Sequence, residues 1–155
     1  SIMGDTGRGS RNSRADSLLE LARVHGKLDD PAMRHQLASV LAMRELNKLT
    51  NARAKAAATQ GTSSSLMSLG KLAMSKILHA EAAVKSQLIG AQALLAGPEN
   101  PVADDVNFLT LNAFFTSIGG GTDQIQRNII GERVLGLPRE PEVDRDIPFR
   151  QARRS

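Results

Sequence analysis

The chain has 155 residues, of which 41% are hydrophobic and 23% charged, a composition typical of one globular domain with a sizeable core. It lacks cysteine, which excludes disulfides and thiolate chemistry, and no apolar run approaches the roughly 18 residues of a membrane span. The net charge of +4 raises nucleic acid as a partner, but the basic residues are scattered and only four Phe could stack on bases. We therefore expect a soluble, cytoplasmic protein that binds neither nucleic acid nor a membrane.

The first half of the chain predicts two helices after a linker. Residues 1–15 are rich in Gly, Ser and Arg, and we interpret them as a flexible linker from an upstream part of the protein. A short helix is expected from Asp16 to about His25, with Asp16 as its N-cap and Gly26 at its end. A second helix should start at Asp30 and Pro31 and continue to about Gln60. Its expected apolar face comprises Met33, Leu37, Val40, Leu41, Leu46, Leu49, Ala52 and Ala56.

Two more helices follow a turn formed by Gly61 to Ser65. Apolar residues at spacings of three and four predict one long helix from about Ser65 to Leu95, antiparallel to its predecessor. Its apolar face comprises Leu66, Leu69, Ala73, Ile77, Ala80, Val84, Leu88, Ala91 and Leu95. A shorter helix is expected from about Asp105 to Ile118, with Phe108, Leu111, Phe115 and Ile118 as its apolar face. No alternating strand pattern is present, so the fold class is all-α.

The last predicted helix follows three glycines, Gly119 to Gly121. Thr122 is its expected N-cap, and the unpaired N–H groups and positive dipole end of such a helix form a natural seat for a phosphate or another anion. An alternative is that Gly119 ends the preceding helix and its neighbours only make a turn. The helix should end at Gly136, so residues 16–138 form a helical bundle and residues 139–155 an extended tail.

No independent catalytic or metal site emerges from the remaining residues. His25, His35 and His79 lie far apart and lack the spacing of paired metal ligands. The acidic pairs Asp29/Asp30 and Asp104/Asp105 precede predicted helices, where carboxylates cap exposed N–H groups. Ser63 to Ser65 lack a Gly-x-Ser-x-Gly context and are interpreted as a turn and cap.

The end of the chain resembles the last helix of acyl-CoA dehydrogenases, whose signature combines a Gly-Thr start, Ile-Gln-Arg and an Arg-x-Leu-Gly ending. The matching residues at the same spacing are Gly120, Gly121, Thr122, Ile125, Gln126, Arg127, Arg133, Leu135 and Gly136. The lengths and order of the preceding helices extend the resemblance to about residues 16–138. It implies an up-and-down helical bundle like the C-terminal domain of that family.

Members of this family are flavoproteins that oxidise the Cα–Cβ bond of an acyl-CoA thioester with FAD and pass electrons to an electron-transfer flavoprotein. They usually assemble as tetramers, so the resemblance implies a homo- or hetero-oligomer here. It also implies that Gly121 approaches the acyl-CoA substrate and that Thr122, Asp123 and Gln124 contact FAD. Gln92 roughly matches a glutamine that reaches the flavin from another subunit.

One departure from the family pattern concerns the catalytic base. Many members carry their catalytic glutamate directly before the Gly-Thr pair, and here that position is Gly120, which has no side chain to accept a proton. We therefore assign no catalytic residue to this chain and expect the isolated fragment to be inactive. In members with a small residue there, the glutamate lies on the preceding helix of the bundle. An alternative is a noncatalytic helical subunit or interaction module of the same fold.

Overall fold

The computed structural model describes residues 9–60, 66–139 and 148. Regular structure in these residues is entirely helical, which confirms the all-α prediction. In chain order the elements are α1 (Gly9–Val24), α2 (Pro31–Thr59), α3 (Leu66–Ile89), the 3-10 helix η1 (Gly90–Leu94), α4 (Pro101–Ile118) and α5 (Asp123–Arg133).

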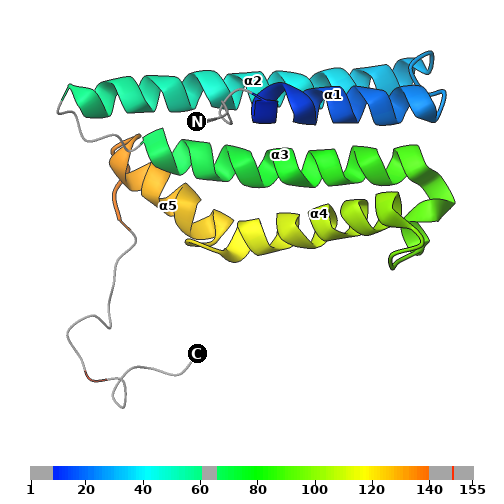
Figure 1. Cartoon of the computed structure of the whole chain (residues 1–155). Helices are drawn as coiled ribbons and strands as arrows, with labels where there is room; N and C mark the ends of the chain where they lie inside the picture. Colours follow the sequence, from blue (N-terminus) through cyan, green and yellow to red (C-terminus); the bar gives the residue numbers. More distant parts are fainter. Residues whose placement is uncertain (1–8, 61–65, 140–147, 149–155) are drawn as a thin grey trace, which may run out of the picture.

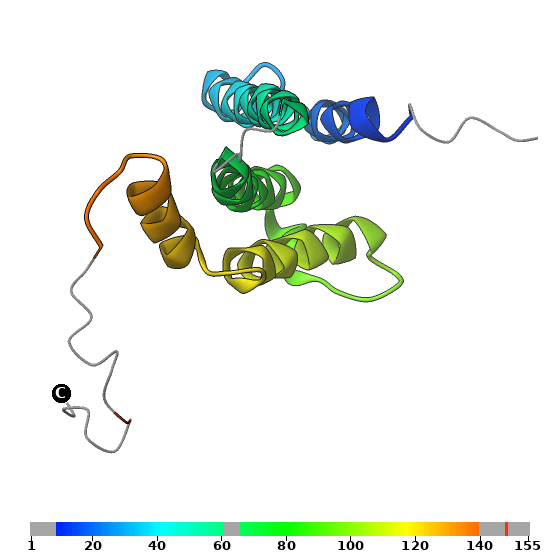
Figure 2. The ribbon, with the colours of Figure 1, turned by 90° about the vertical axis from the view of Figure 1, so that its left-hand side faces the viewer.

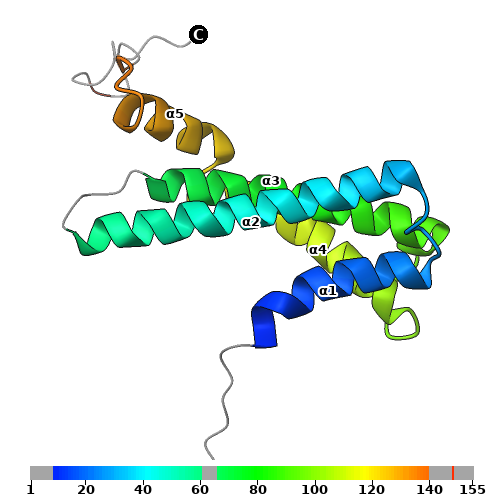
Figure 3. The same ribbon diagram turned by 90° about the horizontal axis from the view of Figure 1, so that it is seen from above.

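The long helix α3 lies at the centre of the bundle and contacts each of the other α-helices. Helices α2, α3 and α4 alternate in direction, as expected for an up-and-down bundle, and α1 lies beside α2 (Figure 1). The end-on view shows α1 and α2 as one layer, α3 beneath them and α4 on the far side of α3 (Figure 2). Helix α5 does not turn back along α4 but diverges obliquely past its end, against the start of α3 (Figures 1 and 3).

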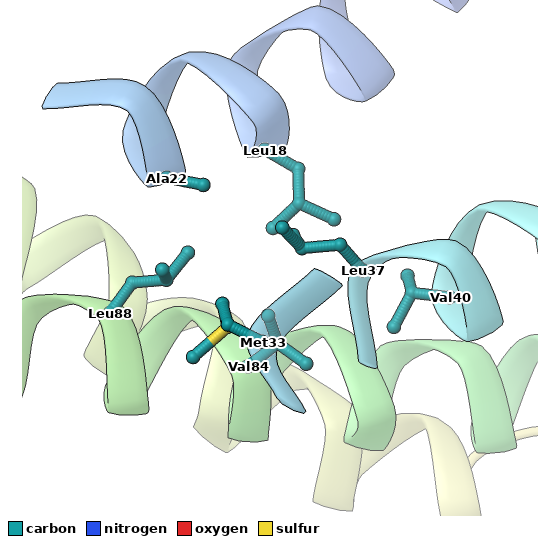
Figure 4. Packing of buried hydrophobic residues seen from close by; sticks show 7 residues of the cluster. All are labelled: Leu18, Ala22, Met33, Leu37, Val40, Val84 and Leu88. Carbon is teal, nitrogen blue, oxygen red and sulfur yellow. The ribbon is translucent and has the colours of Figure 1, made fainter. Parts of the chain in front are cut away.

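Two apolar clusters hold these layers together. The larger one joins α1, α2 and α3 (Figure 4) and comprises Leu18, Ala22, Met33, Leu37, Val40, Val84 and Leu88. The second joins α3 to α4 through Ile89, Ala103 and Val106. Full burial of one such Leu or Val side chain stabilises a fold by about 1.5 to 3 kcal/mol, so these clusters position α3 on both sides.

Local capping signals set the end of α1 and the start of α2 as the sequence predicts. The Asp30 carboxylate accepts hydrogen bonds from the N–H groups of Ala32 (2.9 Å) and Met33 (3.3 Å), and Pro31 occupies the first helical position. Gly26 ends α1 with a φ of 63°, while Lys27 N–H donates to the Ala22 carbonyl. This bond pattern is the glycine-dependent Schellman ending.

Four predicted helix boundaries are wrong. Helix α4 starts at Pro101, so Asp104 and Asp105 lie inside it and do not cap it, and α5 ends at Arg133 rather than at Gly136. Helix α1 starts at Gly9, so Asp16 lies inside it and is not its N-cap, and residues 9–15 are helical rather than linker. Arg and Ala in this segment support a helix, and no proline interrupts it. The long third helix ends at Ile89, because Gly90 takes a φ of 56° and the chain continues as η1 to Leu94.

The predicted core face of α4 is also wrong. Phe108, Leu111, Phe115 and Ile118 are between 68 and 72% exposed, whereas the buried residues of α4 are Ala103, Val106 and Ala113. These small side chains let α4 pack closely on α3, which leaves the large apolar residues on the outer face.

The second half of α2 shows a similar shift. Leu46 and Leu49 are exposed, while Asn47 and Ala54 are buried. The buried positions continue the spacing set by Leu37 and Val40, so the face stays aligned with α3 although its residues become small or polar.

Several sequence-based interpretations concern residues outside the described part of the chain. These are the linker as far as residue 8, the turn and cap at Ser63 to Ser65, and most of the 139–155 tail. At the start of that tail, Arg139 pairs with Glu132 at 3.0 Å. Among the described helices, none is long and apolar enough to cross a membrane.

Candidate functional site at the start of α5

The loop between α4 and α5 requires two of its three glycines. Gly119 caps α4, with its N–H donating to the Phe115 carbonyl at 2.7 Å. Gly120 and Gly121 have φ angles of 67° and 96°, a region that L-residues with side chains rarely adopt. The Gln126 side chain donates to the Gly120 carbonyl at 3.2 Å, and a Cβ added at Gly121 would lie 2.9 Å from Gln126 Nε2. The loop therefore lies directly against α5.

Thr122 is the N-cap of α5, as predicted. Its hydroxyl accepts from the Ile125 N–H at 3.2 Å, and its carbonyl accepts from the Gln126 N–H at 2.9 Å. An α-helix leaves its first N–H groups without a partner inside the helix, and here these belong to Asp123 and Gln124. With the helix dipole, these N–H groups make the helix start beside the glycine loop favourable for an anion. Gln124 is exposed there, so its side chain is free to meet a ligand.

The Asp123 side chain faces α3 rather than the loop opening. One carboxylate oxygen accepts from Lys71 Nζ at 3.2 Å, and the other accepts from Ser75 Oγ at 2.7 Å. Burial raises the pKa of this carboxyl, but the bonds from Ser75 and Lys71 and the charges of Lys71 and Arg127 lower it further, so the net shift is downward. Asp123 therefore stays ionised and anchors α5, which leaves its backbone N–H for a ligand.

A second pair of side chains extends this contact to α4. Ser117 Oγ lies 2.9 Å from Ser75 Oγ and 2.7 Å from His79 Nε2. The His79 ring meets the Phe114 ring edge-on, with centroids 4.9 Å apart. Three helices thus converge on one polar cluster directly beneath the glycine loop.

Sequence reasoning missed the role of this cluster, although one signal was available. Lys71, Ser75 and His79 recur every four residues, which makes a polar stripe on the otherwise apolar helix α3. Ser117 gives no comparable sequence signal, because a single serine near a helix end belongs to no repeated pattern. The fold alone brings it to the stripe.

Gln92 lies at the other end of α3 from the glycine loop. Helix α5 meets α3 at Lys71 and Ser75, whereas Gln92 follows Ile89 in η1. At 1.5 Å per residue, Ser75 and Ile89 are separated by about 21 Å along the helix. Within one chain, Gln92 and Thr122 therefore do not share a site, and a contact of Gln92 with flavin requires a second subunit.

The described residues contain no group of three His, Cys, Asp or Glu side chains that could hold a metal ion. His25 lies at the end of α1, His35 is exposed on α2, and His79 is committed to Ser117. The polar cluster is therefore built from one cation, one carboxylate, two hydroxyls and one imidazole, a set that suits hydrogen bonding rather than metal coordination.

The fold defines the class of protein as an up-and-down helical domain with a glycine loop at one helix start, and comparison with known proteins specifies its family. Residues 14–135 match the family model described as acyl-CoA dehydrogenase, C-terminal domain. The chain therefore belongs to the acyl-CoA dehydrogenase family and corresponds to its C-terminal domain.

Individual relatives agree with this assignment. Acyl-CoA dehydrogenase IpdE1 of Mycolicibacterium smegmatis is 36% identical over 131 residues, covering 80% of this chain and 30% of the relative. IpdE1 of Mycobacterium tuberculosis is 35% identical over 129 residues, covering 80% and 31%. The chain thus spans about a third of the length of the relatives it matches.

The fold also matches a solved structure, described as the Tcur3481-Tcur3483 steroid ACAD. The TM-score is 0.72 at 20% identity, and the match covers 83% of this chain and 34% of that one. This similarity confirms the helical architecture predicted from the sequence.

Proposed function

We propose that this domain lines the flavin and acyl-CoA sites of an FAD-dependent acyl-CoA dehydrogenase and contributes to its assembly. The observation that carries the proposal is the start of α5, where the signature residues form a glycine loop held against a helix start that suits anions. FAD carries a pyrophosphate and acyl-CoA carries phosphates, so both ligands are anionic. When bound, FAD supplies the acceptor for the β-hydride of the acyl thioester.

The residues around the loop fit such a group. The backbone N–H groups of Asp123 and Gln124 are oriented by the Thr122 cap, and the Asp123 charge is compensated by Lys71. Gly121 has no side chain, so a ligand can approach its backbone closely. Thr122, Asp123 and Gln124 would contact FAD, Asp123 through its N–H, and Gly121 would line the acyl-CoA site. Gln92 would reach the flavin of a neighbouring subunit.

A second candidate function is a noncatalytic subunit with the same fold. Gly120 stands where many family members have their catalytic glutamate, and it offers no group that can remove the α-proton. The base must then come from another part of the full-length protein or from a partner. If neither supplies one, the domain binds ligand and partner without catalysing the reaction.

The outer face of α4 supports a role in assembly. Phe108, Leu111, Phe114, Phe115 and Ile118 are all more than half exposed in the chain. Contiguous exposed apolar residues of this size mark an interaction surface. We propose that this face is covered in the assembled oligomer, with electron-transfer flavoprotein as the separate partner that removes the electrons.

The test is to express the full reading frame and to record its absorption spectrum. We expect bound FAD whose absorption bleaches when acyl-CoA thioesters are added without oxygen. Bound FAD that no acyl-CoA bleaches would favour the noncatalytic subunit. Absence of flavin, even after reconstitution with FAD, would contradict the proposal.

A further inference from the structure

Four side chains beneath the glycine loop form a continuous chain of close polar contacts. His79 Nε2 and Ser117 Oγ are 2.7 Å apart, Ser117 Oγ and Ser75 Oγ are 2.9 Å apart, and Ser75 Oγ lies 2.7 Å from Asp123 Oδ2. The four residues come from α3, α4 and α5. This hydrogen-bond chain therefore links α3 and α4 to the first turn of α5.

Only one arrangement of hydrogens satisfies all three contacts. The ionised Asp123 can only accept, so Ser75 donates its single hydroxyl hydrogen to it. Ser75 must then accept from Ser117, which spends the single hydrogen of Ser117. Ser117 can in turn only accept from His79, so His79 Nε2 carries a hydrogen and donates it.

A competing bond of Ser117 does not alter this conclusion. Its hydroxyl also lies 3.1 Å from the Ala113 carbonyl of its own helix. If the hydrogen pointed only there, the two serine oxygens would face each other at 2.9 Å without a hydrogen between them. The ordered chain avoids that repulsion, and all its hydrogens point toward the Asp123 charge.

The burial of these groups makes loss of the hydrogen-bond chain costly. Ser75 has no exposed surface, and the Asp123 side chain is 16% exposed. Loss of one member removes one partner from each neighbour at a site with little access to water, which costs more than loss of an exposed hydrogen bond. The other oxygen of Asp123 is held by Lys71, so both carboxylate oxygens are fixed against α3.

From this geometry we infer that His79, Ser117 and Ser75 are positioning residues for the cofactor site, because they hold Asp123 and thereby fix the N–H groups at the start of α5. The inference rests on the proposed function of that helix start. It assigns the Asp123 side chain to positioning, and only its backbone to the ligand. None of the three residues belongs to the signature helix itself.

The inference is tested in the full-length protein with Ser117→Ala. Thr110→Val is the matched control, because Thr110 lies two turns earlier on α4 and its hydroxyl donates only to the Val106 carbonyl of the same helix, at 2.8 Å. Two quantities are measured for each variant: the FAD dissociation constant and the rate of amide hydrogen exchange in residues 119–126.

For Ser117→Ala we expect about tenfold weaker FAD binding and faster exchange in residues 119–126, because the hydrogen-bond chain is broken between His79 and Ser75. Thr110→Val should change neither quantity by more than about twofold, since its hydroxyl bond is local. Ser117→Thr keeps the hydroxyl and should restore most of the affinity. If Ser117→Ala does not fold, Asp123→Asn, which keeps the side-chain shape, carries the same expectation.

The outcomes separate this inference from the proposed function. Unchanged FAD affinity in Ser117→Ala contradicts the positioning role, even if exchange in the loop becomes faster. A wild-type protein that binds no FAD contradicts the proposed function before any variant is compared. In that case, faster exchange in Ser117→Ala still supports the control of the loop by Ser117, and unchanged exchange contradicts it.

Discussion

At the scale of single residues, Gly121 has two independent reasons to be glycine. Its φ of 96° lies in a region that favours glycine, and a Cβ would meet Gln126 Nε2 at 2.9 Å. Gln126 is buried and holds the Gly120 carbonyl, so it cannot move without loss of that bond. The loop and the first turn of α5 thus form one unit.

Gly121→Ala should lower the free energy of unfolding by about 1 to 2 kcal/mol, because it adds backbone strain and displaces Gln126. Gly131→Ala is the control within α5, where a Cβ would meet Leu137 Cδ1 at an ordinary 3.7 Å. Replacing that helical glycine should stabilise the chain by about 0.5 to 1 kcal/mol. Urea denaturation of both variants measures their free energies of unfolding. Equal changes in the two variants would contradict the requirement for glycine at Gly121.

Asp123 gives the site a defined dependence on pH. Its pKa is lowered from an ordinary 3.8 in the folded chain, so the carboxylate stabilises the fold above that value and the stabilisation is lost as the pH falls through the folded pKa. Asp123→Asn should therefore destabilise the chain at neutral pH by about 1 to 3 kcal/mol. The measurement is denaturation of the variant and the wild type at neutral pH and at acid pH. The difference between variant and wild type should shrink in acid, and a constant difference would exclude this linkage.

At the scale of helices, a buried ion-pair cluster joins α2 to α3. Arg44 contacts the carboxylate of Glu81, and Lys85 Nζ lies 3.0 Å from its other oxygen. The Glu81 side chain is 5% exposed and that of Arg44 19%, so the contact brings two opposite charges together largely away from water. Burial raises the pKa of Glu81, but its two cationic partners lower it more.

Glu81→Leu alone should cost about 3 kcal/mol or more of unfolding free energy, because Arg44 is left buried without its counter-charge. The double variant Arg44→Met with Glu81→Leu should recover most of that loss, since apolar packing replaces the pair. Thermal or urea unfolding of the single and double variants, compared with the wild type, gives a double-mutant cycle. Purely additive losses would show that the two residues are not coupled.

The sequence predicted the helix ends better than the packing faces. Asp30, Gly26 and Thr122 act within a few residues of their own position, so their roles are visible locally. Which face of α4 is buried depends on α3, and close helix packing there selected Ala103 and Ala113 over the large apolar residues. Periodicity identifies an apolar stripe but not the partner that covers it.

The candidate site shows the same difference between local features, which the sequence predicts, and contacts between helices, which it does not. The glycine loop and the Thr122 cap were predictable, because the signature residues and the capping rule are local. The contacts of Asp123 were not, because Lys71 and Ser75 are 52 and 48 residues away in sequence. The contact of Ser117 with His79 spans 38 residues. Only the folded chain brings these groups together.

At the scale of the whole molecule, the proposal that this domain works within a larger assembly rests on the outer face of α4. Phe115→Asp should reduce oligomerisation of the full-length protein while leaving the bundle folded, since Phe115 is 70% exposed in the chain. Met67→Asp is the control, because Met67 is similarly exposed, at 74%, but lies at the start of α3. Sedimentation measures the assembly and circular dichroism the fold. Full assembly of the Phe115 variant would exclude α4 as an interface.

The central claim is that the start of α5, beside the glycine loop, faces the flavin in the full-length protein. The most direct test is to measure amide hydrogen exchange with and without bound FAD. The claim predicts that FAD slows exchange at Asp123 and Gln124, while the comparable helix start at Asp30 to Met33, which the Asp30 carboxylate caps, is unchanged. FAD binding that leaves exchange at Asp123 and Gln124 unaltered would contradict it.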